Sequence, residues 1–399
     1  MSHTPHPSGR VREVFSAFLL LGLTSFGGPI AHLSYFRTEF VERRRWLSEQ
    51  AYADLVALCQ FLPGPASSQV GFALGLMRGG AWGAAAAWTA FTLPSAIVLV
   101  LFALGAAVLE GPVSQGIIHG LKVTAVAIVA HAVWGMARSL CPDSRRAGIA
   151  LAAVFTVVLV SGPLGQVAAI MIGALAGMVL CRTQDATQAH TLSLPVSARV
   201  GHLAALAFMV LLVGLPLLAW ASPSATLAVM DAFYRAGALV FGGGHVVLPL
   251  LEAEVVQSGW VTPDDFLAGY GAAQAVPGPL FTFAAYLGTV MGPLGGSLLG
   301  AALALIMIFL PGLLLLVAVL PHWNRFRRWV GAQALMRGAN AAVVGILGAA
   351  LYHPVFTSAI LGPQEFALAL TGFLLLSVWK LPAWAVVIIL AAGGIVITL

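Results

Sequence analysis

Long apolar stretches, bounded or interrupted by glycine and proline, follow one another along almost the whole chain. An apolar stretch broken by Phe-Gly-Gly covers 14–33, and a second stretch, broken by Pro-Gly-Pro, covers 51–77. Two unbroken stretches follow near 82–109 and 117–138, and a pair of shorter ones occupies 148–181. Because a transmembrane helix needs about 20 predominantly apolar residues, this pattern predicts a series of full-length and broken membrane helices.

The same order of segments recurs in the second half of the chain. The aligned motifs are Phe26-Gly27-Gly28 with Phe241-Gly242-Gly243, and Pro63-Gly64-Pro65 with Pro277-Gly278-Pro279. Residues between the motifs also match, because Trp46 aligns with Trp260 and Gln60 aligns with Gln274. The order and spacing predict that the chain consists of two homologous halves.

We place the first repeat at 1–182 and the second at 226–399, joined by a linker at 183–225. The linker contains an apolar segment at 203–221 that is long enough to form one connecting transmembrane helix. A single additional crossing between corresponding points turns the second half over relative to the first. The expected architecture is therefore an inverted-topology repeat, which many secondary transporters share.

Composition confirms the membrane class and excludes others. Of the 399 residues, 60% are hydrophobic and 8% are charged, whereas an ordinary soluble domain has roughly 25% charged residues. This excludes a soluble enzyme and a disordered chain, and it predicts an all-α polytopic protein whose main partner is the lipid bilayer. The net charge of +5 is small and scattered, so no nucleic-acid partner is expected.

The distribution of charge supports the inversion. The segment 34–50 contains four arginines, whereas its counterpart 250–265 contains four acidic residues and no basic one. The next loop shows the opposite bias, because 110–116 holds only Glu110 and 321–331 holds three arginines. Lys and Arg are retained on the cytoplasmic side, so matching loops with opposite bias predict opposite orientations.

The broken stretches admit two topologies. If they are re-entrant and return on the side from which they started, every basic cluster lies in the cytoplasm, and the chain has about nine full crossings and four hairpins. If they cross fully, the chain has about thirteen crossings and the cluster Arg43–Arg45 lies outside. We favour the re-entrant topology.

The four helix breaks are the candidate functional site. A break inside a membrane frees backbone groups that lipid cannot satisfy, and the half-helix that follows carries partial positive charge at its amino end. Converging amino ends would bind an anion without any lysine, although glycine and proline could instead only bend the helices for packing. The candidate anion ligands are Thr24, Ser25, Phe26, Gly27, Gly28, Gln60, Pro63, Gly64, Pro65, Ser67, Ser68, Phe241, Gly242, Gly243, His245, Gln274, Pro277, Gly278, Pro279 and Thr282.

Few charged side chains lie within apolar segments. Lys122 opens a span and either snorkels towards the interface or contacts the anion, and Arg78 is either a cytoplasmic anchor or a gate. Asp231 and Arg235 stand four residues apart on one helix, which predicts a local ion pair.

Two further pairs of titratable residues carry weaker predictions. Glu39 aligns near Glu254, and the two are either a coupling pair or, as we expect, solvated side chains of charged segments. His32 and His245 flank the Phe-Gly-Gly breaks without matching each other, which favours ordinary packing over a role as ring donors to an anion.

Signatures of catalysis and of metal binding are missing from the sequence. It contains no H-E-x-x-H, G-x-S-x-G or Walker A motif, and its three cysteines show no C-x-x-C spacing. We therefore expect a protein with no catalytic residues, no metal site and no cofactor.

The repeated motifs resemble those of the chromate ion transporter (CHR) family in its two-domain, long-chain form. The segments that carry the resemblance are 22–29 (GLTSFGGP), 60–65 (QFLPGP), 91–94 (FTLP), 241–245 (FGGGH) and 274–279 (QAVPGP). The resemblance implies a multi-pass protein of the cell inner membrane that exports chromate and confers chromate resistance, with sulfate as a chemical look-alike.

The small number of charged side chains within the apolar segments agrees with export of a dianion. A secondary transporter driven by the membrane potential, or by the proton motive force, needs no ATP-binding motif. A sulfate importer or exchanger is the alternative, and an intramembrane enzyme or scaffold is a remote one. The sequence leaves the oligomeric state open, with a homodimer as one option.

Overall fold

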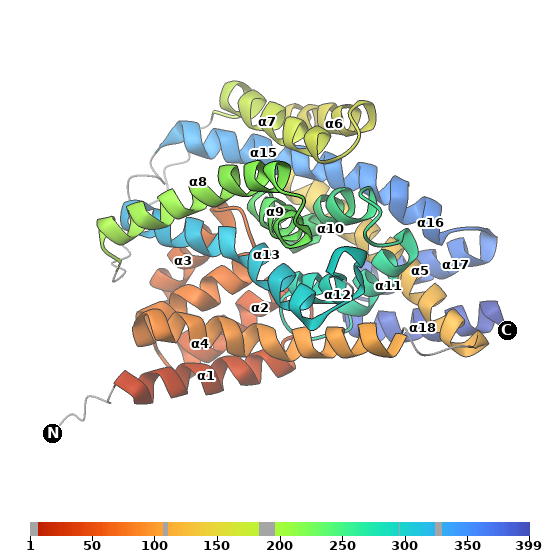
Figure 1. Ribbon diagram of the computed structural model, residues 1–399, viewed down its shortest axis with the longest axis horizontal. Helices are drawn as coiled ribbons and strands as arrows, with labels where there is room; N and C mark the ends of the chain where they lie inside the picture. Colours follow the sequence, from red (N-terminus) through yellow and green to blue (C-terminus); the bar gives the residue numbers. More distant parts are fainter. Residues whose placement is uncertain (1–6, 107–110, 183–195, 295, 324–328) are drawn as a thin grey trace.

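The computed structural model describes residues 7–106, 111–182, 196–294, 296–323 and 329–399, and every regular element within these ranges is helical (Figure 1). Six of the described helices are long and apolar enough to cross a membrane. These observations confirm an all-helical membrane protein. Glu110 and the arginine cluster at 325–328, which contributed to the charge argument, lie outside the described residues.

The first half contains the helices that the apolar pattern predicts. In chain order they are α1 (Pro7–Thr24), α2 (Gly28–Phe36), the π-helical turn η1 (Arg37–Arg43), α3 (Glu49–Phe61), α4 (Ala66–Ala106), α5 (Pro112–Leu140), α6 (Ser144–Leu159) and α7 (Pro163–Leu180). Local capping fixes several boundaries, since Ser48 accepts a hydrogen bond from Ala51 at the start of α3. Asp143 caps α6 in the same way, and the hydrogen bonds from Arg146 hold the pKa of this exposed carboxylate below its usual value.

The second half follows the same order after the connecting helix α8 (Ala198–Ala221). Its elements are α9 (Ala225–Ala238), η2 (Gly244–Val246), α10 (Val247–Leu251), the π-helical turn η3 (Glu252–Val256), α11 (Pro263–Ala273), η4 (Leu280–Thr282), α12 (Phe283–Val290), η5 (Gly292–Leu294), α13 (Leu298–Val319), η6 (Leu320–His322), α15 (Val330–Ala350), η7 (Leu351–Phe356), α16 (Thr357–Ala359), α17 (Pro363–Ser377) and α18 (Ala383–Thr398). Both halves therefore break at the Phe-Gly-Gly and Pro-Gly-Pro motifs, and both carry a π-helical turn between them.

Helix α4 is a tight hairpin of two arms, 66–78 and 81–106. Gly79 and Gly80 leave the helical conformation, and Gly80 has a φ of 63° that favours glycine. The arms pack backbone to backbone, because a Cβ on Gly83 would lie 2.3 Å from the carbonyl oxygen of Gly75. A corresponding glycine contact brings α12 against α13, so this close approach is a feature of both halves.

In the first half, the ends of both broken stretches return to the start of α1. The guanidinium of Arg78, at the end of the first arm of α4, lies 2.9 Å from the Glu13 carboxylate. Arg44, which follows η1, lies 3.7 Å from the same carboxylate, and the Trp46 indole donates a hydrogen bond to it. One acidic residue near the beginning of α1 thus joins the ends of the two broken stretches.

The broken stretches of the second half also end close to each other. The amide of Gly292, after α12, donates a hydrogen bond to the Trp260 carbonyl, with 3.1 Å between nitrogen and oxygen. Trp260 in turn lines one cavity together with Ala228 from the first turn of α9. The two broken stretches therefore end near the start of α9.

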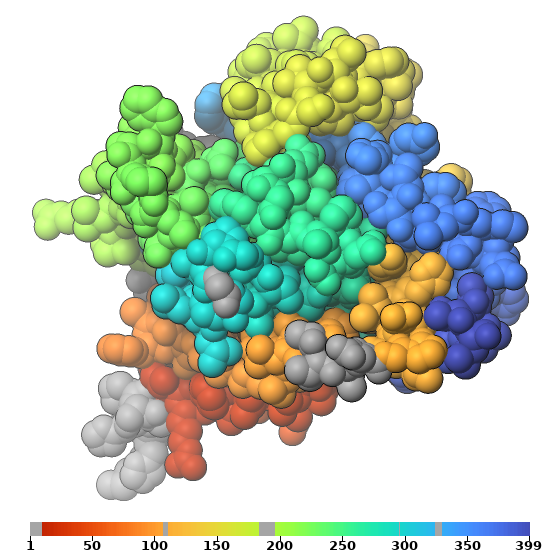
Figure 2. Space-filling model, turned by 45° about the vertical axis from the view of Figure 1, so that its right-hand side comes forward, coloured from red at the N-terminus to blue at the C-terminus, as the bar shows by residue number. Residues whose placement is uncertain are grey.

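The last two helices of each half pack against the long helix of the other half. Helices α17 and α18 contact α5, whereas α6 and α7 contact α15 (Figures 1 and 2). The contacts are close enough to require glycine, since a Cβ on Gly120 of α5 would lie 2.4 Å from the Leu390 carbonyl oxygen. The two homologous halves are therefore interlocked.

Candidate anion-binding site

The two Pro-Gly-Pro breaks are each hydrogen-bonded to the Phe-Gly-Gly break of the other half. The amide of Gly64 donates to the carbonyl of Val240, with 2.7 Å between nitrogen and oxygen. The amide of Gly278 donates to the carbonyl of Ser25 at 2.9 Å. Because Val240 and Ser25 directly precede the two Phe-Gly-Gly motifs, these matched bonds join the four breaks in two pairs. Gly244 brings the pairs together, since a Cβ there would lie 3.4 Å from Pro29 and 4.0 Å from Leu280.

Only glycine fits at the centre of each Pro-Gly-Pro break. Gly64 and Gly278 have φ values of 114° and 100°, a region that other residues rarely adopt. A Cβ on Gly64 would lie 3.0 Å from the Cα of Gly312 in α13, and one on Gly278 would lie 2.2 Å from the hydroxyl of Ser95 in α4. Gly312 and Ser95 each follow the proline inside their helix, so the crowding is also matched between the halves.

Two side chains fasten these breaks to the helices that cross beside them. The amide nitrogen of Gln69 donates to the carbonyls of Pro63 and Gly312, both at 2.9 Å. The hydroxyl of Ser95 donates to the carbonyl of Pro277. Neither residue is among the predicted ligands, although Gln69 directly follows the predicted ligands Ser67 and Ser68.

The Phe-Gly-Gly loops combine positive φ values with open space. Gly27 and Gly28 have φ values of 99° and 76°, and Gly242 and Gly243 have 77° and 137°. A Cβ on Gly28 or Gly243 would meet no described atom within 4 Å. Conformation, rather than crowding, therefore requires glycine at these two positions, and the open backbone leaves room for a ligand to approach.

Helix α2 begins directly at the first of these loops. Its nine residues start at Gly28, with Gly27 as the N-cap residue and no capping side chain. The first amides of a helix have no partner within the helix, and they carry the positive end of its dipole. The start of α2 therefore presents hydrogen-bond donors at the place where the four breaks meet.

Three of the predicted polar ligands keep an unused donor. The hydroxyls of Ser25 and Ser68 are buried, with the residues 1% and 2% exposed, and neither has a hydrogen-bond partner among the described residues. The side-chain nitrogen of Gln274 is likewise buried and unpartnered within the described part of the chain. A buried polar group without a partner costs about 1–3 kcal/mol, so each of these donors remains available for one further hydrogen bond.

The other predicted ligands are engaged within the protein or lie at its surface. The hydrogen bonds run from Thr24 to the Leu20 carbonyl, from Thr282 to the Pro279 carbonyl, and between Ser67 and the His32 ring. Gln60 is exposed, the Phe26 ring packs against Trp384, and Phe241 packs against the main apolar core. Pro65 is buried within the first Pro-Gly-Pro break.

The two histidines are hydrogen-bonded rather than merely packed. His32 is buried, and its Nε2 lies 3.2 Å from the Ser25 carbonyl oxygen, which also accepts the bond from Gly278. Nδ1 of His245 lies 2.9 Å from the hydroxyl of Tyr270. His32 therefore stiffens one of the breaks, a role that its position in the sequence did not predict.

Lys122 and Arg78 both form ion pairs with acidic residues. The ammonium group of Lys122 lies 2.8 Å from the Asp264 carboxylate at the start of α11, a side chain that is mostly exposed. Arg78 pairs with Glu13, and its guanidinium lies 5.3 Å from the centre of the Trp46 ring. These contacts agree with the interpretation of Arg78 as an anchor, located at the end of the molecule where α1 starts.

The solvated state expected for Glu39 and Glu254 is wrong. Their exposed fractions are 8% and 9%, and they lie in the π-helical turns η1 and η3. Glu39 pairs with two arginines that follow it closely in the sequence, whereas Glu254 pairs with Arg235 at 2.8 Å. The predicted ion pair between Asp231 and Arg235 is confirmed at 2.9 Å.

Comparison with known proteins assigns the family. The model of the chromate transporter family matches residues 12–178 and 227–397, which correspond to the two repeats. A probable chromate transport protein of Synechococcus elongatus is 28% identical, and the match covers 98% of this chain and 96% of that protein. Chromate transport proteins of Pseudomonas aeruginosa and Cupriavidus metallidurans are 27% and 26% identical, over 96% and 94% of this chain and 90% of each of those proteins. No solved structure shows detectable similarity to the chain. The protein, a membrane transporter rather than an enzyme, belongs to the chromate transporter family.

Proposed function

We propose that the protein exports chromate from the cytoplasm across the inner membrane and thereby confers chromate resistance. The full-length relatives whose names specify chromate transport support the substrate. The observation that carries the site is the bonding of each Pro-Gly-Pro break to the Phe-Gly-Gly break of the other half, through the amides of Gly64 and Gly278.

A site built from backbone and hydroxyl donors suits a tetrahedral dianion. The start of α2 and the free hydroxyls of Ser25 and Ser68 offer neutral donors. Lys122 and Arg78, the cations that the sequence singled out, are both paired with carboxylates. The anion would therefore be held by dipoles, which allows it to be released without first breaking a strong ion pair.

The membrane potential supplies the driving force. Moving one charge through 100 mV is worth about 2.3 kcal/mol, so a dianion leaving a cell with a negative interior gains about 4.6 kcal/mol per 100 mV. This energy sustains a gradient on the order of a thousandfold. Export of chromate by a secondary transporter therefore requires no ATP.

The proposed topology is an inverted repeat of re-entrant hairpins. The contacts of Glu13 with Arg44 and Arg78 support it, because they join the start of the first broken stretch to the ends of both broken stretches. In this arrangement the breaks lie near the middle of the membrane, where two hairpins from each half meet. The anion site would then be reachable from either side as the two halves rock against each other.

The test is chromate uptake into inside-out membrane vesicles or proteoliposomes with a potential set by potassium and valinomycin. We expect a positive interior to drive accumulation of chromate, with sulfate added as the competing anion. Transport that is unchanged when the potential is dissipated would overturn potential-driven export.

Variants of the free hydroxyls test the site in the same assay. We expect Ser25→Ala and Ser68→Ala each to raise the half-saturating chromate concentration about tenfold, since a hydrogen bond to a charged group is worth about 1.5–3 kcal/mol. Thr371→Ala is the matched control, because this exposed hydroxyl bonds to the Ala367 carbonyl of its own helix. Equal effects of all three changes would argue against a site at the breaks.

A further inference from the structure

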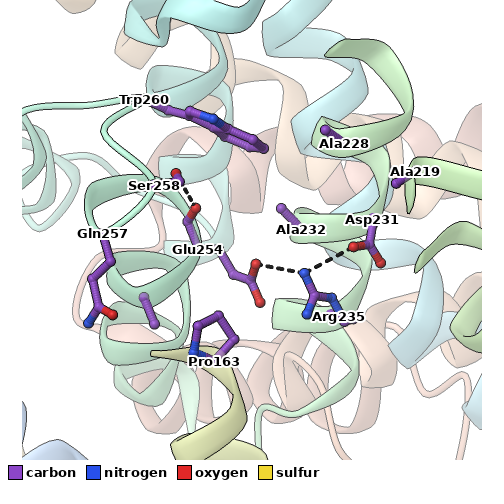
Figure 3. A pocket seen from close by; sticks show the side chains of 11 residues that line it. Pro163, Ala219, Ala228, Asp231, Ala232, Arg235, Glu254, Gln257, Ser258 and Trp260 are labelled. Atoms are coloured by element: carbon purple, nitrogen blue, oxygen red, sulfur yellow. Dashed lines mark hydrogen bonds and ion pairs between the residues drawn. The ribbon is translucent and has the colours of Figure 1, made fainter. Parts of the chain in front are cut away.

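A cavity of about 420 Å³ lies beside α9, and none of the residues that line it belongs to the four breaks (Figure 3). It is formed by α9, the turn η3, the end of α8 and the start of α7. Three charged side chains line it, Asp231, Arg235 and Glu254, and the two carboxylates point towards the guanidinium between them.

The three charges form a compact cluster with one shared donor. Nη2 of Arg235 lies 2.9 Å from a carboxylate oxygen of Asp231 and 2.8 Å from one of Glu254. The two carboxylates are therefore within about 6 Å of each other, where like charges oppose each other's ionised form. Asp231 is 8% exposed and Glu254 is 9% exposed, so water screens this repulsion poorly.

One guanidinium compensates only one of the two carboxylates. The second oxygen of Asp231 is buried and has no hydrogen-bond partner among the described residues. A nearby acidic residue, Glu252 on η3, hydrogen-bonds to Gln257 and adds no positive charge. Helix α13, which also packs against α9, has no charged residue between 298 and 319. The cavity therefore lacks one positive charge.

The corresponding place in the first half has a different composition. The positions that align with Asp231 and Arg235 hold Ser16 and Leu20. The glutamate that aligns with Glu254 has two arginine partners there instead of one. The charge deficit is therefore confined to the second half and is not required by the repeated scaffold.

We propose that this cavity binds one proton, shared between Asp231 and Glu254, and that the proton moves inwards as chromate moves outwards. A proton neutralises the cluster, whereas an anion would increase its negative charge. A metal ion fits poorly, because the guanidinium lies between the carboxylates and the described residues contain no group of three or more histidine, cysteine or acidic side chains that could hold one.

The cavity is connected to the anion site through α9. Arg235 lies one turn before the end of α9, and Val240, just beyond it, accepts the hydrogen bond from Gly64. A change in the ion pairs of Arg235 therefore acts on the helix that leads into the second Phe-Gly-Gly break. The inference rests on the proposed export of chromate and specifies the ion to which export is coupled.

The experiment uses proteoliposomes whose membrane potential is clamped at zero and whose interior has a lower pH than the exterior. Both solutions are alkaline enough to keep chromate a dianion. For transporters oriented inside out, we expect the wild-type protein to accumulate chromate about tenfold more for each unit of pH difference, because one proton is exchanged per anion. Asp231→Asn and Glu254→Gln should lose this accumulation but still take up chromate when a potential is applied. That retained uptake shows that the variants are folded.

Controls separate the possible failures. Glu42→Gln, which alters an exposed ion pair with Arg37, should respond to the pH difference as the wild-type protein does. If the pH difference has no effect on the wild-type protein, or only a sodium gradient does, the proton site is refuted while potential-driven export stands. If Asp231→Asn and Glu254→Gln both accumulate chromate in response to the pH difference as fully as the wild-type protein, the proton site is also refuted. Absence of chromate uptake under every condition would instead refute the proposed function.

Discussion

At the scale of single residues, the site depends on side chains that connect the two halves. Gln69 is completely buried, and its amide nitrogen bridges the carbonyl of Pro63 in its own half and that of Gly312 in the other half. Its carbonyl oxygen is buried without a partner in the described part of the chain. A glutamine supplies two donor hydrogens from one nitrogen, which is the number that this junction needs.

The change Gln69→Glu tests this bridge. A carboxylate of the same shape would direct acceptors at two carbonyl oxygens, and we expect a loss of about 3 kcal/mol or more in the free energy of unfolding. The thermal unfolding midpoint of the purified protein in detergent measures this loss. Gln115→Glu is the control, since Gln115 is exposed and its change should leave the midpoint nearly unaltered.

At the scale of elements, the breaks are held open by backbone geometry. Gly278→Ala should impair transport severely and lower the unfolding midpoint, because a Cβ would collide with the Ser95 hydroxyl at a residue whose φ is 100°. Gly214→Ala in α8 is the matched control. It faces open space within a helix, so the change should be neutral or stabilise by about 0.5–1 kcal/mol. Comparable losses in both variants would show that the break geometry is not specifically required.

Much of the element order could be predicted from the sequence. Apolar length and the glycine and proline motifs are local features, so they located the breaks and the long helices such as α5 and α15. The π-helical turns were not predicted, and the burial of Glu39 was missed with them. A π-helical turn changes which face of a helix a side chain occupies, and the pattern of charged residues contains no signal for it.

At the scale of the whole molecule, the exchange between halves could not be predicted. Helices α7 and α18 are both apolar and of similar length, so hydrophobicity does not tell which long helix each contacts. The choice is made by backbone contacts between glycines, such as Gly338 of α15 against Gly173 of α7. The sequence shows those glycines but not their partners. For the same reason, the meeting of the breaks was expected whereas the hydrogen bonds that produce it were not.

The proposed inverted orientation of the two halves makes a prediction about sidedness. Position 43 is the last residue of the first π-helical turn, and position 257 directly follows the second. Both side chains are exposed. In a variant whose three native cysteines are replaced by alanine, Arg43→Cys should react with a membrane-impermeant maleimide only in inside-out vesicles. Gln257→Cys should react only in intact spheroplasts, because re-entrant hairpins in inverted halves place these two positions on opposite faces of the membrane.

Labelling of both positions from the same side would contradict the inversion. Labelling of position 43 from outside would show that the first broken stretch crosses the membrane, and would contradict the hairpin even if the two halves remained inverted.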